Sequence, residues 1–133
     1  MKMTLAKTLA KEFSIKNLEP SHNLKESAEL SLISLAVNVH VPNDTNAQAF
    51  AISFQVKAVF KGSEYLEIDC DYWAFFESEQ ELSAEFLESH FTKINAPAIA
   101  YPYLRSFITN VLVSAGYPAV YLPTVNFVEM AKD

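Results

Sequence analysis

The feature that most constrains this chain is a long apolar segment between Ile99 and Ala115, in which Arg105 is the only charged residue. The pattern predicts a helix that is apolar nearly all round, and such a helix must be buried on more than one side. A chain of 133 residues is expected to form a single domain, over residues 1–133, with one small core. One sheet face covers one helix face, so we expect the opposite face of this helix to pack against a second subunit.

The composition favours a compact, strand-rich protein of the cytoplasm. A hydrophobic fraction of 50% with only 2 glycines argues against disorder. The longest apolar run falls well short of the roughly 20 residues that span a bilayer. Residues 1–8 lack the hydrophobic stretch of a signal peptide. We therefore expect no membrane insertion, and the single cysteine, Cys70, excludes an intrachain disulfide and suits a reducing compartment.

The charged and reactive residues exclude several classes of function. A net charge of −6 without a basic stripe disfavours nucleic acid as a partner. His22, His40 and His90 lie in different predicted elements, so no metal site or cofactor is expected. The chain has no glycine-rich phosphate loop and no nucleophile elbow, and Cys70 falls on the apolar side of its predicted strand. We expect neither an enzyme nor a protein driven by ATP.

The first half of the chain alternates between apolar and polar residues, which is typical of half-buried strands. Strands are predicted over residues 8–16, 28–41, 50–61 and 66–73, and a change of parity at Leu32 and Ile33 predicts a bulge. Turn residues occupy 42–46 and 61–63. The prediction is an α+β fold in which a four-stranded antiparallel meander packs on the long helix.

The second half of the chain has helical spacing. Apolar residues from Leu82 to Ile94 predict a short amphipathic helix that starts near Glu79. Asn95 is the predicted N-cap of the long helix, and Pro102 predicts a kink or a second start within it. Gly116 and Pro118 predict its end. After an extended linker, Asn126 and Glu129 have the spacing of a capping box and predict a short C-terminal helix.

The long helix and the linker resemble a known family. Residues 101–109, Tyr-Pro-Tyr-Leu-Arg-Ser-Phe-Ile-Thr, are similar to the helix signature of the SecB export chaperones. Residues 117–127, from Tyr-Pro to Val-Asn-Phe, resemble its continuation at the same spacing, and residues 11–15 are similar to the family's first strand. The resemblance implies a homotetramer, a dimer of dimers with its long helices between two sheets. It also implies ATP-independent holding of unfolded or nascent polypeptides, commonly secretory precursors, for delivery to the SecA motor.

Two alternatives stay open beside this hypothesis. The linker reads Leu122-Pro123-Thr124 where the family usually has Leu-Ala-Pro, and the segment after it is shorter than in the family. These departures favour a variant of the function, a SecB-like chaperone dedicated to an antitoxin or another specific client without delivery to SecA. From a different class, hot-dog and cystatin-like enzymes or ligand-binding proteins hold a pocket between helix and sheet, which here only Arg105, Thr109 and Asn110 could make polar.

Holding an unfolded chain requires exposed apolar grooves, and aromatic side chains suit them because each contacts many kinds of residue. Our candidates for a client-binding groove are aromatic residues of the fourth strand, the long helix and the linker: Trp73, Phe75, Phe76, Tyr101, Tyr121 and Phe127. Taken singly, each is as well explained as an ordinary core or interface residue. The candidates for the oligomer interface lie on the long helix: Tyr103, Phe107, Ile108, Val111 and Leu112.

Carboxylates gather between Glu64 and Glu88, with no lysine or arginine among them. Such a cluster can dock a basic partner, for which the resemblance suggests the zinc-binding tail of SecA, or attract positively charged clients. Strand alternation places Glu67, Asp69 and Asp71 on one wet face, which makes them the best docking candidates. The plainer interpretation is a solvated sheet face.

Overall fold

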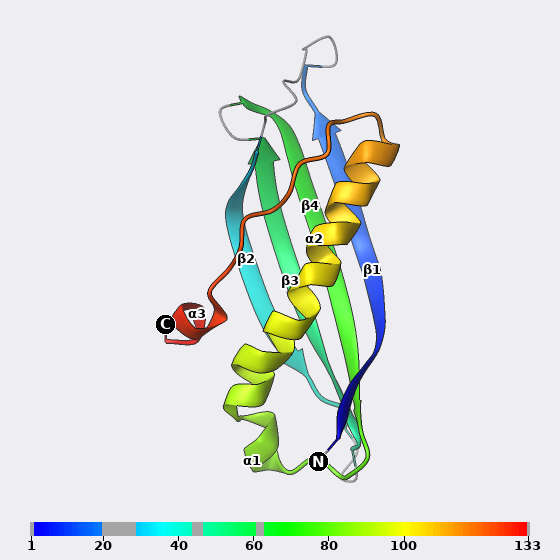
Figure 1. The fold of residues 1–133 in the computed structure, drawn as a ribbon, viewed down its shortest axis with the longest axis vertical. Helices are drawn as coiled ribbons and strands as arrows, with labels where there is room; N and C mark the ends of the chain where they lie inside the picture. The colour runs from blue at the N-terminus through cyan, green and yellow to red at the C-terminus, as the bar shows by residue number, and fades with distance from the viewer. Residues whose placement is uncertain (1, 20–28, 44–46, 61–62, 133) are drawn as a thin grey trace.

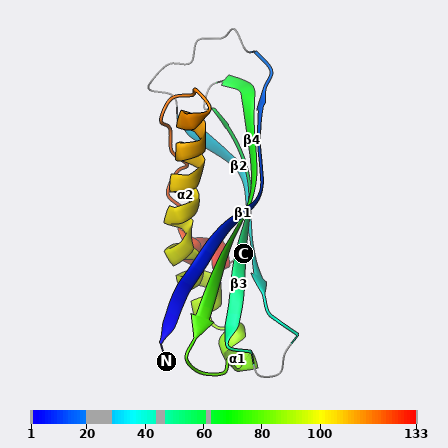
Figure 2. The same ribbon diagram turned by 90° about the vertical axis from the view of Figure 1, so that its right-hand side faces the viewer.

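The structure is a computed structural model that describes residues 2–19, 29–43, 47–60 and 63–132. A four-stranded antiparallel sheet carries one long helix across one of its faces, and an extended linker leads from that helix to a short C-terminal helix (Figure 1). In the side view the long helix and the linker lie on the same side of the sheet (Figure 2). Among the described residues, no helix covers the other face. The predicted α+β class is confirmed.

The strands are β1 (Met3–Asn17), β2 (Leu30–His40), β3 (Ala49–Phe60) and β4 (Ser63–Ser78). Their order in the sheet is β1-β4-β3-β2, so β2, β3 and β4 form a meander while β1 pairs with β4. The predicted meander of four sequential strands is therefore wrong for β1, which lies beside β4 and not beside β2. The topology is that of a Greek key. The connection over residues 18–29 is much longer than a tight hairpin, so nothing local forces β1 and β2 to pair. The turn positions 44–46 and 61–62 lie outside the described residues.

Two bulges in β1 upset the expected alternation. The register against β4 shifts between Leu5 and Lys7 and again between Ala10 and Glu12. A bulge changes which residues face the core, so Phe13 packs inward while Leu9, which would share its face in an unbroken strand, is exposed. In β2 the register shift between Leu32 and Ser34 confirms the bulge predicted there.

The helical half begins differently from the prediction. The helix α1 (Ala84–Leu87) is short, and a π-helical turn, η1 (Phe91–Asn95), then leads directly into α2 (Ala96–Ser114). The single amphipathic helix expected before the long one is interrupted at Ser89, whose hydroxyl donates to the Phe86 carbonyl and accepts from the Phe91 N–H. Serine side chains that bond nearby backbone in this way compete with helical hydrogen bonds.

Two further helix predictions have mixed outcomes. Asn95 has helical torsion angles and makes no side-chain cap bond, because α2 continues the preceding turn instead of starting afresh. Pro102 lies inside α2, which runs past it as one helix (Figure 1). The predicted second start at Pro102 is therefore wrong.

The end of α2 follows the sequence prediction. Gly116 has a φ of +98°, and its N–H donates to the Val113 carbonyl at 3.1 Å while the Tyr117 N–H donates to the Leu112 carbonyl at 2.8 Å. This pair of bonds is a Schellman motif, in which glycine adopts the left-handed conformation at no steric cost. The last helix, α3 (Phe127–Ala131), begins at Asn126, whose Oδ1 accepts from the Glu129 N–H at 3.2 Å.

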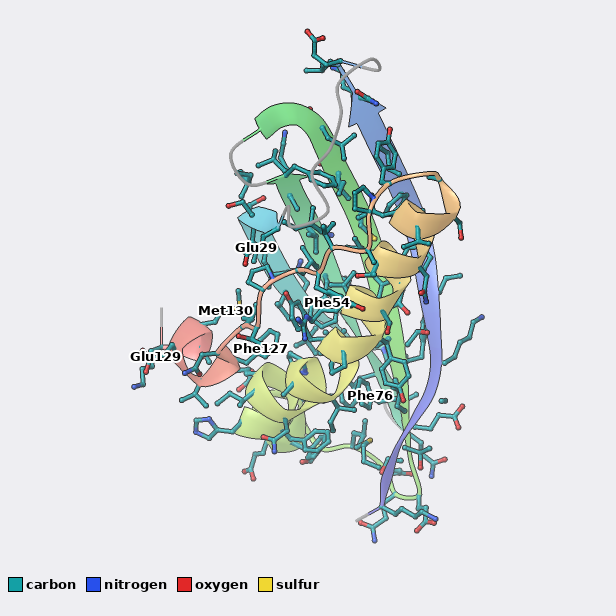
Figure 3. The ribbon with its side chains drawn as sticks, turned by 45° about the horizontal axis from the view of Figure 1, so that its top comes forward. Glu29, Phe54, Phe76, Phe127, Glu129 and Met130 are labelled. Carbon is teal, nitrogen blue, oxygen red and sulfur yellow. The ribbon has the colours of Figure 1, made fainter. Side chains whose placement is uncertain are left out.

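The core lies between the sheet and the layer formed by α2 and the linker. Alternate residues of β3 and β4 are buried in it: Phe50, Ile52, Phe54, Val56, Ala58 and Phe60 from β3, and Leu66, Ile68, Cys70, Tyr72, Ala74 and Phe76 from β4. The helix contributes Leu104, Ile108 and Leu112, and the linker contributes Val120 and Leu122. The rings of Phe54 and Phe127 lie close together on this side of the sheet, with centroids 6.3 Å apart (Figure 3).

Replacing Phe54 by alanine tests this core. The ring is fully buried and contacts Tyr101 and Phe127, so Phe54→Ala should lower the free energy of unfolding by about 3–5 kcal/mol. Ile33→Ala, at the exposed bulge of β2, is the matched control and should change it by less than about 0.5 kcal/mol. Urea denaturation followed by circular dichroism measures both, and equal midpoints for the two variants would contradict the described packing.

Candidate functional site

One face of α2 is uncovered in the single chain. We call it the exposed α2 face and define it by Ile99, Pro102, Tyr103, Ser106, Asn110 and Val113. Its large side chains, Ile99, Tyr103 and Val113, are 45%, 52% and 50% exposed. A hollow on this face is lined by Pro102, Tyr103, Ser106, Phe107 and Asn110. Contiguous apolar surface of this kind commonly marks a site of protein contact.

The five residues predicted for an oligomer interface fall on two sides of α2. Tyr103 is exposed, and Phe107 and Val111 are half-buried at the margin of the exposed α2 face. The Phe107 ring packs edge-on against Phe13 of β1, with centroids 5.5 Å apart. Ile108 and Leu112 are instead fully buried against the chain's own sheet. Tyr103, Phe107 and Val111 therefore reach a surface that a partner could contact, and Ile108 and Leu112 do not.

The opposite flank of α2 holds the linker, residues 117–126, through three side-chain hydrogen bonds. Thr109 Oγ1 donates to the Val120 carbonyl at 2.7 Å, Arg105 Nε to the Leu122 carbonyl at 2.9 Å, and Tyr101 Oη to the Pro123 carbonyl at 2.7 Å. We call this set the α2–linker ladder. Four residues of helix rise about 6 Å, and two residues of extended chain span about 6.6 Å, which matches the step from the Val120 to the Leu122 carbonyl. The next step, from Leu122 to Pro123, is a single residue.

The ladder includes Arg105, the only charged residue of the long helix. A charge in apolar surroundings needs a polar partner or water, and Arg105 bonds a backbone carbonyl. Its guanidinium carbon also lies 6.0 Å from the centroid of Tyr121, a ring that is 57% exposed. Burial raises the pKa of Tyr101 to about 12, against the opposing charge of Arg105, so its hydroxyl remains a donor at physiological pH. Tyr101, Arg105 and Thr109 stand four residues apart, and this spacing of polar groups on one helix face is the sequence signal for the ladder.

The polar residues proposed for an enclosed pocket do not line one. Arg105 and Thr109 are bonded to the linker, and Asn110 is exposed on the opposite face of α2. The described residues thus give no support to the hot-dog or cystatin-like alternative, which requires polar groups between helix and sheet.

The six aromatic residues predicted for a client-binding groove do not form a single surface. Phe76, Tyr101 and Phe127 are buried in the core, at 1%, 4% and 6% exposure. Trp73 and Phe75 lie half-buried on the outer face of the sheet, away from α2. Tyr121 is exposed beside α2. Of the six residues, Tyr121 is therefore the one whose ring is exposed on the side of the sheet that carries α2.

Trp73 is the centre of a group on the outer sheet face that we call the outer-face cluster: His40, Ser53, Trp73, Phe75, Lys7 and Lys11. His40 stacks on Trp73 with ring centroids 4.0 Å apart and shares a 2.7 Å hydrogen bond with the fully buried Ser53. Lys11 Nζ lies 5.3 Å from the Trp73 centroid, and Lys7 Nζ lies 5.8 Å from that of Phe75. The chain's own side chains therefore cover part of the Trp73 and Phe75 rings.

Glu67, Asp69 and Asp71 lie together on the outer face of β4, as alternation predicted. Lysines of neighbouring strands are interleaved with them. Lys16 of β1 pairs in register with Glu67, and Lys57 of β3 with Asp69. Asp71 Oδ1 accepts from Trp73 Nε1 at 2.9 Å. The acidic run along the sequence therefore becomes a surface of mixed charge in the sheet.

The other candidate features of the described residues are the Cys70 thiol, potential metal ligands and the hydropathy of the helices. Burial, with a smaller effect of Asp71, raises the pKa of the Cys70 thiol to about 12, so this residue is a packed side chain and a poor nucleophile. No group of three potential metal ligands occurs in the part of the chain that the structure describes, from which His22 is excluded. None of the described helices combines the length and hydropathy needed to traverse a bilayer.

The buried rung of the ladder can be tested by removing its donor. Thr109→Val keeps the shape of the side chain but leaves the Val120 carbonyl without its partner, so unfolding should become easier by about 1–3 kcal/mol. Thr109→Ser restores the hydroxyl and should recover most of that loss. Urea denaturation measures both, and a Thr109→Val protein as stable as the serine variant would show that this rung contributes nothing.

Comparisons with known proteins agree with this arrangement. The whole chain, residues 1–133, matches the family described as preprotein translocase subunit SecB. A segment of 37 residues is 46% identical to the protein-export protein SecB of Methylibium petroleiphilum, which is 28% of this chain and 23% of that protein. A segment of 73 residues is 34% identical to an uncharacterised protein of Methanocaldococcus jannaschii, covering 55% of this chain and 44% of that protein. These matches therefore span less than half of either curated relative.

Two solved structures share the fold at low sequence identity. One is a SecB-like chaperone of Mycobacterium tuberculosis in complex with a ChAD peptide from an antitoxin, with a TM-score of 0.68, 13% identity, and coverage of 93% of this chain and 88% of that one. The other is a protein of unknown function from Streptococcus agalactiae, with a TM-score of 0.56, 14% identity, and coverage of 93% and 98%. Taken with the match over the full sequence, they place the sheet, α2 and the linker in one known architecture. The chain belongs to the SecB family of chaperones.

Proposed function

We propose that this protein is an ATP-independent holdase, a chaperone that binds unfolded or nascent polypeptides and keeps them competent for export through the Sec pathway. Membership of the SecB family is the observation that carries the proposal. The exposed apolar side chains of α2 and the linker supply a physical basis for it, since burying apolar client surface contributes about 25 cal/mol per Å².

The client surface that we propose lies along the linker. Tyr121 of the linker and Val128 of the adjoining α3 are 57% and 48% exposed, and Val125 of the linker is half-buried between them in sequence. The ladder holds the linker extended, so a client would meet a fixed surface and lose less entropy than it would on a mobile one. Trp73 and Phe75 stay candidates for a second contact area on the outer sheet face.

We further propose that the exposed α2 face is the self-association surface of a homotetramer, a dimer of dimers. Tyr103, Phe107 and Val111 would be its contact residues. This arrangement would leave the linker and the outer sheet face open. Glu67, Asp69 and Asp71 on that outer face are the proposed docking residues for a basic partner such as SecA.

A second candidate function is a chaperone dedicated to one client, such as an antitoxin, without delivery to SecA. The fold shared with a SecB-like chaperone solved with an antitoxin peptide favours it. The mixed charge around Glu67 and Asp69 favours it too, because interleaved lysines weaken a purely acidic docking surface.

An aggregation assay tests the proposal and separates the two candidates. In the absence of ATP, a stoichiometric amount of the protein should delay light scattering by two unrelated denatured test proteins, because apolar burial tolerates many sequences. Protection of a single client would favour the dedicated chaperone. Failure to slow the aggregation of any of a panel of denatured proteins, including an antitoxin, would contradict both functions.

Light scattering after size-exclusion chromatography tests the assembly. The wild type should elute as a tetramer, and Tyr103→Asp should yield smaller particles because it places a charge on the proposed apolar contact. Val128→Asp carries the same new charge on exposed surface outside that contact and should leave the particle mass unchanged. A wild-type protein that runs as a monomer at all concentrations would refute the self-association surface.

A further inference from the structure

The hollow on the exposed α2 face is already formed in the single chain. Its volume is about 440 Å³, and Phe107 is one of its walls. Two rings of the sheet hold the Phe107 ring in place, since its centroid lies 5.5 Å from that of Phe13 and 5.3 Å from that of Tyr72. Tyr103 and Asn110 line the same hollow, one heptad apart along the helix. A partner therefore meets a preformed recess with polar groups at both ends.

The polar groups of this hollow have no partner within the chain. The side chains of Tyr103 and Asn110 make no hydrogen bond to a described residue. Water can satisfy both groups, because Tyr103 is 52% exposed and Asn110 is exposed as well. Covering the hollow removes that water, and an unsatisfied buried hydroxyl or amide is strongly unfavourable. Any occupant must therefore supply a hydrogen-bond partner for each group.

The charge of the exposed α2 face restricts what can cover it. None of its residues is charged, and Arg105, the only charged residue of α2, bonds the Leu122 carbonyl on the opposite flank. A charged side chain buried on this face would stay unpaired, which is costly. The suitable occupant is apolar and uncharged and carries an amide and a hydroxyl. The exposed α2 face of a second copy has this composition.

A twofold axis can place the two polar groups opposite each other. In a twofold-symmetric contact, residue i of one copy meets residue j of the other, and j meets i. Tyr103 and Asn110 lie nearly on one line along the helix, about 10.5 Å apart. When two antiparallel copies of α2 meet with the axis between Ser106 and Phe107, Tyr103 of each copy enters the hollow of the other and faces Asn110. The hydroxyl donates and the amide oxygen accepts, so both groups are satisfied.

We propose that Tyr103 and Asn110 form a reciprocal pair of hydrogen bonds that determines the register between two copies of α2. The inference rests on the proposed self-association surface, and it adds which residues of the two copies meet. A shifted register leaves a polar group unmatched. With Tyr103 opposite Ser106, for example, Asn110 would face the apolar Ile99. The apolar residues supply the affinity of the contact, and the polar pair selects one alignment.

Cysteine cross-linking measures this register. Ser106→Cys lies beside the proposed axis, where two copies come within the roughly 4.4–6.8 Å between Cα atoms that a disulfide needs, so mild oxidation should link them. Two copies of Asn110→Cys would lie about 10.5 Å apart along the helices and should not link. Co-expressed Tyr103→Cys and Asn110→Cys chains should link to each other. The native Cys70 is buried, and wild-type protein gives the background.

A double-mutant cycle tests the hydrogen bonds themselves. Tyr103→Phe and Asn110→Leu each leave the other group without its partner at two symmetric places, so each should raise the dissociation constant of the contact about 10- to 100-fold. The combined variant removes both groups and should come back to within about tenfold of wild type. Tyr121→Phe deletes the same hydroxyl from an exposed ring outside the contact and should change the constant by less than about twofold. Light scattering over a concentration series measures all four variants.

The outcomes are distinguishable. If Ser106→Cys does not cross-link in the assembled protein, or if the effects of Tyr103→Phe and Asn110→Leu simply add, the pairing is wrong and the self-association surface stands. A wild-type protein that is monomeric at every concentration overturns both. Cross-linking does not depend on the two variants of the cycle, so it decides the register even where one of them fails to fold.

Discussion

The structure depends on how α2 is held between two extended partners. On one side Leu104, Ile108 and Leu112 pack on the alternate apolar residues of β3 and β4. On the other side three polar side chains of the same helix bond the backbone of the linker. The linker in turn buries Val120 and Leu122 in the sheet-side core. A segment without regular secondary structure thereby joins the core, because its carbonyls are satisfied by the helix instead of by a neighbouring strand.

This arrangement separates the two surfaces of the subunit. The outer sheet face holds the outer-face cluster and carries carboxylates and lysines side by side. The segment formed by α2 and the linker is mostly apolar, and Arg105 is its only charged residue. The charged side chains of the sheet and the exposed apolar side chains of α2 and the linker therefore lie on opposite sides of one sheet.

Much of this fold was accessible from the sequence, because the signals were local. The strands, the Schellman end at Gly116 and the cap at Asn126 each follow from a few neighbouring residues. The pairing of β1 with β4 could not be predicted, since the long connection before β2 places no restriction on where β1 lies. The sequence likewise did not show which apolar residues of α2 face the sheet. When a helix is apolar all round, its periodicity does not tell Ile108, which packs on the sheet, from Tyr103, which is exposed. The run of carboxylates in the sequence suggested an acidic surface for a related reason. Its lysine neighbours, Lys16 and Lys57, become adjacent to it only after the strands pair.

The α2–linker ladder also determines which changes in chain length the protein tolerates. Adding one residue between Val120 and Leu122 would move every later position by one, so an apolar side chain would point to water and a carbonyl would leave its donor. Adding residues after Asn126 would disturb neither relation. Natural or engineered length variation should thus be confined to the ends of the linker, and its middle can be exchanged between relatives only as a unit with α2.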